Sequence, residues 1–138
     1  MNARDSEILI RRYFDAFNRG DIDGMLVCVT DDVVHDVNQG ERRIGKERFR
    51  AFCARMAHHY KEVLDGVAVM TSDDGSRAAA EFNVTGTYLV TDSGLPDATG
   101  QRYALPAGTF FVVRDGKIAR VTTYYNLTEW IVQVSGAA

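Results

Sequence analysis

The chain of 138 residues has very few cysteines and prolines. Its two cysteines, Cys28 and Cys53, are too few for a disulfide framework, and their apolar neighbours favour buried free thiols. No CxxC or HExxH pattern occurs, and His58 and His59 are adjacent rather than one helical turn apart. The sequence therefore predicts neither a metal site nor a cofactor.

Long apolar runs and an excess of positive charge are also absent. The longest apolar run, residues 25–29, is far shorter than the ~20 residues of a membrane span or the ~7 residues of a signal-peptide core. The 16 basic and 19 acidic residues leave a net charge of −3, whereas nucleic-acid-binding proteins present a basic face. We therefore expect a soluble, cytoplasmic protein that binds neither membranes nor nucleic acid.

The sequence does have the composition of an ordinary globular domain, with 46% hydrophobic and 25% charged residues. A chain of this length forms one domain, here residues 1–138, and buries roughly two-thirds of the surface of the unfolded chain. Such a domain has a sizeable core and room for an internal cavity without disulfides or a metal.

Helical patterns dominate the first sixty or so residues. Apolar residues recur at helical spacing from Leu9 to Phe17, and Asp21 can cap a second, short helix. A short strand over residues 33–38 then pairs back with residues 42–44. A third helix is predicted from residue 46 to residue 60, because its apolar side chains share one helical face.

Strand patterns fill the second half of the chain. Alternation predicts strands over residues 67–71, 77–90, 101–114 and 117–125, with a tight hairpin turn at Asp115 and Gly116. Asn126 opens a capping box that predicts a short C-terminal helix. This order predicts an α+β fold, in which a strongly curved antiparallel sheet wraps on three N-terminal helices.

Six segments carry a family pattern: RYF at 12–14, RGDIDGM at 19–25, TDDVVHD at 30–36, EFNVTG at 81–86, DGKI at 115–118 and TYY at 123–125. Together they resemble the nuclear transport factor 2-like superfamily, and most closely its ketosteroid isomerase and SnoaL-like polyketide cyclase branch. The resemblance covers nearly the whole chain. It implies a cone-shaped, cystatin-like fold with a deep apolar pocket, commonly in a homodimer.

The resemblance implies a ligand but leaves two classes of function open, because this fold hosts unrelated activities. The ligand is expected to be small, mostly apolar and oxygen-bearing, such as a steroid-like, polyketide or terpenoid ring. One class is a cofactor-independent isomerase, cyclase or lyase that acts by proton abstraction. The alternative is a non-catalytic small-molecule-binding or dimerisation domain.

Two catalytic positions follow from the resemblance. Tyr13 matches the tyrosine that donates a hydrogen bond to the developing enolate oxygen, and Asp36 matches the catalytic base if one residue is deleted before it. A shift of one residue exchanges the faces of a strand. Either Asp36 and Asn38 face the pocket, as the resemblance favours, or His35 does, as burial of the neighbouring valines favours. Both arrangements leave one inward group that can act as a base.

The second acid of the ketosteroid isomerase site has no counterpart. Gly108 stands at its position and can donate only a backbone N–H. Each lost oxyanion donor costs on the order of 10²–10³ in rate, so steroid isomerisation itself is disfavoured.

Alternation and helical spacing predict the pocket lining. The remaining predicted ligand-binding residues are Phe17, Phe52, Met56, Phe82, Val84, Phe110, Val121, Thr123 and Tyr125. Glu81, Asn83 and Thr85 then lie on the outer sheet face, where a homodimer contact is expected. An inward Glu81 is the alternative.

Overall fold

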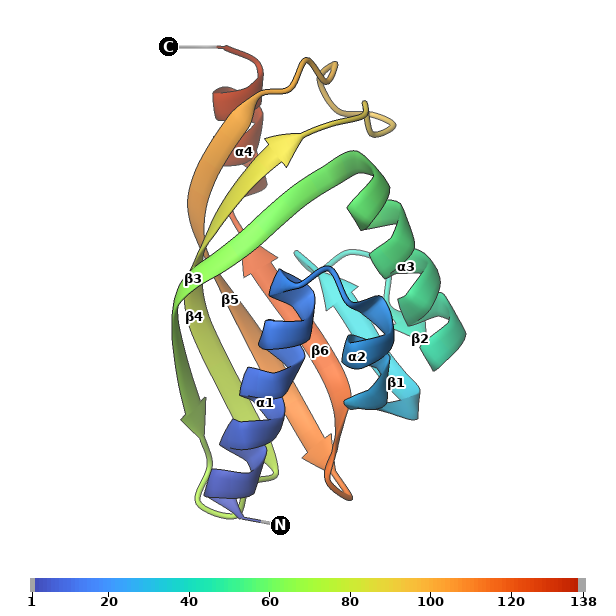
Figure 1. Ribbon diagram of the computed structural model, residues 1–138, viewed down its shortest axis with the longest axis vertical. Helices are drawn as coiled ribbons and strands as arrows, with labels where there is room; N and C mark the ends of the chain where they lie inside the picture. Colours follow the sequence, from blue (N-terminus) through green and yellow to red (C-terminus); the bar gives the residue numbers. More distant parts are fainter. Residues whose placement is uncertain (1, 137–138) are drawn as a thin grey trace.

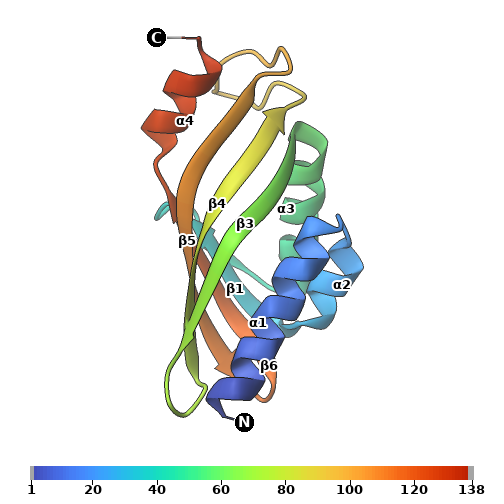
Figure 2. The same ribbon diagram turned by 60° about the vertical axis from the view of Figure 1, so that its left-hand side comes forward.

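The computed structural model describes residues 2–136, in which a curved sheet wraps around helices α1, α2 and α3 (Figure 1). The elements are α1 (Ala3–Asn18), α2 (Ile22–Val27), β1 (Val29–Val37), β2 (Arg43–Ile44), α3 (Lys46–His59), β3 (Tyr60–Thr71), β4 (Arg77–Tyr88), β5 (Arg102–Arg114), β6 (Lys117–Tyr125) and α4 (Leu127–Val134). The long strands β3, β4 and β5 run past α1, and α4 lies at the end opposite the start of α1 (Figure 2).

The six strands form one sheet in the order β2-β1-β6-β5-β4-β3. The predicted α+β class, with three N-terminal helices and a curved sheet, is confirmed. One detail differs, because β1 and β6 pair in parallel whereas every other neighbouring pair is antiparallel. Parallel neighbours need a long connection between them. Here that connection contains α3 and four strands. Over such a distance in sequence, the pattern of a single strand does not show which direction its neighbour runs.

The helices begin and end at residues that satisfy free backbone groups. The Asn2 side chain accepts a hydrogen bond from the Asp5 N–H at the start of α1, and Asp21 does the same for Gly24 at the start of α2. Gly20 ends the turn between them with a φ of +70°, a conformation that favours glycine. Asn126 caps α4 through the N–H of Glu129.

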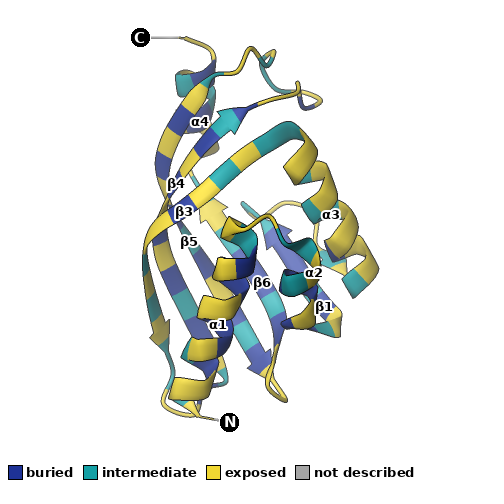
Figure 3. Cartoon of the chain, in the orientation of Figure 1, coloured by how far each residue is buried: buried dark blue, intermediate teal, exposed yellow. Residues whose placement is uncertain are grey.

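The core lies between α1 and the inner face of the sheet, which is the face turned toward the helices (Figure 3). Ile10 of α1 and Phe111 of β5 are fully buried, and the rings of Phe14 and Phe82 meet edge to face with centroids 5.3 Å apart. Full burial of a side chain of this size contributes about 1.5–3 kcal/mol. This packing fixes which residues of β4 and β5 point inward.

Two predicted inward residues, Gly108 and Phe110, lie instead on the outer face. β4 and β5 pair Phe82 with Ala107, and so their inward set includes Thr109 and Phe111. Phe110 is 46% exposed and packs against Tyr124 of β6 on the outer face. The prediction was wrong because two adjacent phenylalanines fit either phase of the strand alternation, and only pairing with β4 decides between them.

The C-terminal helix α4 completes the sheet where β6 has ended. Its Gln133 side chain both donates to the Ala104 carbonyl and accepts from the Ala104 N–H, each at 2.9 Å. The amide thus replaces a neighbouring strand, and Trp130 is buried beside Tyr103. None of the helices in the described part of the chain is long and apolar enough to cross a membrane.

Candidate functional site

The structure decides which of two neighbouring residues on β1 faces the interior. His35 is the neighbour of Val121 in the β1–β6 pair, and Val121 is a core residue. The imidazole is only 4% exposed and lies against the rings of Phe49 and Phe52, with centroids 5.0 and 4.4 Å away. His35, and not Asp36, is therefore the titratable residue of β1 that faces inward.

The surroundings of His35 favour its neutral form. Burial lowers the pKa of the imidazole to about 4, and the positive charge of Arg43 contributes in the same direction. The buried Nδ1 atom has no hydrogen-bond partner among the described residues. A neutral imidazole has one nitrogen that can accept a proton, so His35 offers an unused polar group inside an aromatic cluster.

Asp36 lies on the outer face, which corrects the interpretation that the resemblance favoured. It is the neighbour of Thr122, and its carboxylate accepts from Arg42 at 2.9 and 3.0 Å. Asp36 is 6% exposed, and burial alone would raise its pKa, but Thr122 and Arg42 outweigh burial and lower it. The fully buried Val33, two residues before His35, keeps the odd-numbered side of β1 inside.

Tyr13 lies in the same aromatic cluster as His35. Its side chain is 6% exposed, stacks against Phe49 at 6.4 Å and meets Phe111 edge to face at 5.9 Å. Burial raises the pKa of the Tyr13 hydroxyl well above its usual value, so the phenol stays protonated. Tyr13 and His35 thus both contact the ring of Phe49.

The other predicted lining residues divide into two groups. Buried in the core are Phe82, Val84 and Val121. Partly exposed are Phe17, Phe52, Met56, Thr123 and Tyr125.

Asn38 has a different place. With a φ of +53° it ends β1, and its side chain accepts a hydrogen bond from the Tyr125 N–H at 2.8 Å. Asn38 therefore extends the pairing between β1 and β6.

The sequence prediction missed a second polar group on the inner face, formed by Glu62 of β3 and Tyr103 of β5. The Tyr103 hydroxyl donates to Glu62 Oε2 at 2.6 Å. Glu62 alternates with Tyr60 and Leu64 along the inner side of β3. The predicted strand began only at residue 67, because the residues before it do not alternate between apolar and polar. The sequence did contain one signal. A glycine inside a strand, here Gly86, indicates that another group packs closely against the backbone at that position.

Burial raises the pKa of Glu62, although the hydrogen bond from Tyr103 works against this shift. Burial, followed by the charge of Glu62, also raises the pKa values of Tyr103 and Tyr125. Tyr125 belongs to β6, so three strands bring polar groups to this end of the inner face.

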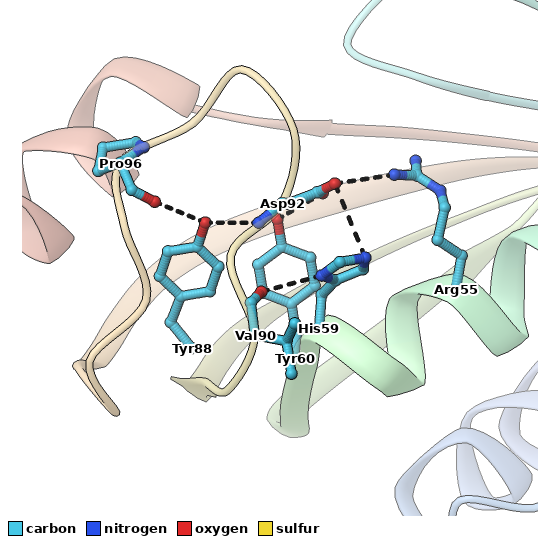
Figure 4. Close-up of polar contacts among 7 residues, drawn as sticks. All are labelled: Arg55, His59, Tyr60, Tyr88, Val90, Asp92 and Pro96. Atoms are coloured by element: carbon cyan, nitrogen blue, oxygen red, sulfur yellow. Dashed lines mark hydrogen bonds and ion pairs between the residues drawn. The ribbon is translucent and has the colours of Figure 1, made fainter.

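A third polar group, the rim cluster, joins the loop 89–101 to the start of β3 (Figure 4). It consists of Arg55, His59, Tyr60 and Asp92. The buried Asp92 carboxylate accepts from the Tyr60 hydroxyl at 2.8 Å and from Arg55 at 3.0 Å. His59 Nδ1 lies 2.9 Å from the Val90 carbonyl, an acceptor, so this nitrogen carries the proton. The rim cluster holds the loop against α3.

The described part of the chain contains no cluster of side chains suited to a metal ion. Between residues 2 and 136, no three side chains of His, Cys, Asp or Glu come together in an arrangement that could hold a metal ion. Acid–base groups on the inner face include His35, Glu62 and Tyr103.

The comparisons with known proteins agree with this architecture. The model of the SnoaL-like domain matches residues 10–121. The chain belongs to the SnoaL-like family. The match includes every element from α2 to β5 in full, with just over half of α1 and of β6. None of the curated proteins matches this chain.

Three solved structures are similar to this chain over nearly their whole length, and each is described as a candidate polyketide cyclase. The protein from Xanthomonas campestris is 52% identical, with a TM-score of 0.94 over 97% of this chain and 99% of the other. The protein from Silicibacter is 57% identical, with a TM-score of 0.93 over 97% and 98%. The protein from Pseudomonas putida is 56% identical, with a TM-score of 0.90 over 91% and 95%.

Proposed function

We propose that this SnoaL-like protein binds a small, mostly apolar, oxygen-bearing ring molecule at its inner face and removes a proton from it. The reaction class is that of a cofactor-independent isomerase, cyclase or lyase, with His35 as the base. The candidate cyclases from Xanthomonas, Pseudomonas and Silicibacter support this class of substrate, since the chains share more than half of their residues.

The observation that carries the proposal is the unpartnered Nδ1 of His35 among aromatic rings. A buried polar atom without a hydrogen-bond partner costs free energy. A bound ligand that donates a hydrogen bond or a proton to this atom would remove that cost. With its pKa at about 4, the imidazole is unprotonated at neutral pH. It is therefore free to accept a proton from a carbon next to a carbonyl group, as a weaker base than an imidazole of ordinary pKa. Positioned bases accelerate such a proton transfer by about 10²–10⁴.

Hydrogen exchange of a ring ketone tests the proposal without knowledge of the natural substrate. The probe is 1-tetralone in D₂O, and proton NMR measures the loss of its protons next to the carbonyl. We expect the wild-type protein to catalyse this exchange and His35→Ala to lower the rate by at least 10²-fold. Tetralone affinity should stay within a few-fold, because the aromatic rings remain.

Asp36→Asn is the matched control, since it alters the neighbouring residue on the outer face. Its exchange rate should equal that of the wild type. Equal exchange in the wild type and in His35→Ala would refute His35 as the base. Binding of tetralone without any exchange above buffer would favour the non-catalytic binding domain.

We also propose that two copies associate through the outer sheet face, as a homodimer. Phe110, Tyr124 and Met70 are between 41% and 53% exposed on this face, and exposed apolar patches mark interaction sites. Phe110 lies between two shallow hollows, one lined by Arg120 and the other by Glu81. A two-fold axis near Phe110 would place the basic hollow of one copy over the acidic hollow of the other.

A further inference from the structure

We propose that Glu62 and Tyr103 form the binding site for the ligand's carbonyl oxygen. In this site, Glu62 donates a hydrogen bond from Oε1 to the ligand, and Tyr103 holds Oε2. Glu62 would then contact the ligand directly, whereas Tyr103 positions Glu62. The inference rests on the proposed ligand class, but it does not depend on His35 as the base.

The pair is built by three neighbouring strands. Glu62, Gly86 and Tyr103 occupy one row across β3, β4 and β5, since Glu62 pairs with Gly86 and Gly86 pairs with Tyr103. The Tyr103 ring lies over Gly86 and reaches the carboxyl two strands away. A Cβ atom on residue 86 would overlap with Cζ and the hydroxyl oxygen of Tyr103. Only glycine at position 86 permits this contact.

The hydrogen bond from Tyr103 leaves the other carboxyl oxygen for a ligand. Tyr103 donates to Oε2, and no described residue is a partner of Oε1. Glu62 is only partly buried, whereas Tyr103 and Leu64 beside it are buried. In a protonated carboxyl group whose Oε2 accepts from a phenol, the proton is carried by Oε1. Oε1 is then a hydrogen-bond donor.

The surroundings retain that proton. The titratable groups that face Glu62 are Tyr103 of β5, Tyr125 of β6 and Tyr60 of β3 itself, and Tyr60 in turn contacts Asp92. None of these groups is a cation that would stabilise a carboxylate. Burial raises the pKa of Glu62, because it removes water from the charged form. A neutral carboxylic acid in an apolar site can donate to a carbonyl oxygen, whereas a carboxylate would repel it.

The same end of the inner face is rich in aromatic rings. Tyr103 lies 5.8 Å from Trp130 between ring centroids, and Trp130 also contacts Tyr60 and Tyr88. Aromatic walls with a few polar groups at fixed places are typical of small-molecule sites. The arrangement selects a ring compound with a hydrogen-bond acceptor, because the donor Glu62 would lose its partner with a plain hydrocarbon.

Binding of a matched pair of compounds tests the inference. The probes are 1-tetralone and tetralin, which share one ring skeleton and differ in the ketone oxygen. NMR titration measures both affinities, and the fluorescence of Trp130, the single tryptophan, reports binding near this end. We expect wild-type protein to prefer tetralone by about fivefold to tenfold at low pH. This preference should disappear as the pH rises through the raised pKa of Glu62.

Three variants separate the role of Glu62 from general packing. Glu62→Gln keeps a donor in its amide and should retain the preference at every pH. Glu62→Leu keeps the volume and should bind both compounds equally. Tyr103→Phe removes a hydrogen bond that stabilises the carboxylate, so the preference should persist to higher pH than in the wild type. Circular dichroism checks that each variant is folded.

The outcomes distinguish this inference from the proposed function. A tetralone preference that is unchanged in Glu62→Leu, or a pH dependence that persists in Glu62→Gln, overturns the role of Glu62 and leaves the ligand class intact. Absence of binding by both compounds to the wild-type protein refutes the ring-binding function, and the inference fails with it.

Discussion

At the scale of single residues, His35 links stability to pH. Its pKa is lowered to about 4 in the folded chain, whereas the imidazole of the unfolded chain titrates near pH 6.5. Between pH 4 and pH 6.5, the imidazole is therefore protonated in the unfolded chain but neutral in the folded chain. The contribution of His35 is therefore complete above about pH 6.5 and is lost as the pH falls toward 4, by about 1.4 kcal/mol per pH unit.

Replacement of His35 by Leu should make stability less dependent on pH. From pH 7 to pH 4.5, the wild type should lose about 2–3 kcal/mol more than His35→Leu, because the variant has no imidazole to protonate. Urea unfolding at both pH values measures this difference. His58→Leu is the control, since residue 58 is exposed, and should follow the wild type. Equal losses in the wild type and His35→Leu would contradict the burial of a neutral His35.

The site shows which residues a single sequence can place. The valines around His35 predicted its inward orientation correctly, since apolar burial acts within the strand itself. The resemblance favoured Asp36, and a one-residue gap was sufficient to exchange the faces. Glu62 was missed because its role depends on Tyr103, which is 41 residues away in sequence. Such a contact exists only once strands have paired.

At the scale of elements, the rim cluster fixes the loop between β4 and β5. Asp92→Ala removes the acceptor of Tyr60 and Arg55, which should cost about 1–3 kcal/mol of unfolding free energy. Amide hydrogen exchange over residues 89–101 should become faster. Asp97→Ala, at an exposed acid of the same loop, should change neither quantity. Similar protection of the loop in both variants would exclude an anchoring role for Asp92.

Element boundaries were predicted well where local signals exist. Asp21, Asn126 and the hairpin at Asp115 and Gly116 each lie where the sequence placed them. The start of β3 was placed seven residues too late, at 67 instead of 60, because the inward Glu62 and the exposed Val63 break the apolar–polar alternation of its first half. Two features could not be predicted because they depend on strands distant in sequence. One is the parallel direction of β1 relative to β6, and the other is the side of the sheet on which Phe110 lies.

At the scale of the whole molecule, the proposed homodimer depends on the outer sheet face. Phe110→Asp places a charge at the centre of the proposed dimer contact, and desolvation of that charge should dissociate the dimer. Light scattering at micromolar concentration should give about 30 kDa for the wild type and 15.3 kDa for the variant.

Ile8→Asp is the matched control for this prediction. Ile8 is 49% exposed, similar to Phe110, but it belongs to α1. The control protein should remain dimeric. A wild-type protein that is monomeric at this concentration, or a Phe110→Asp variant that stays dimeric, would refute the proposed contact.

The parallel pairing of β1 with β6 also has a consequence for synthesis on the ribosome. Residues 29–37 emerge early, but their partner is the last strand of the sheet, residues 117–125. Until then β1 can pair only with the two residues of β2, and the strand that carries His35 has no other neighbour in the sheet. Contacts this distant in sequence slow folding. The inner face around His35 is therefore completed only when nearly the whole chain has left the exit tunnel.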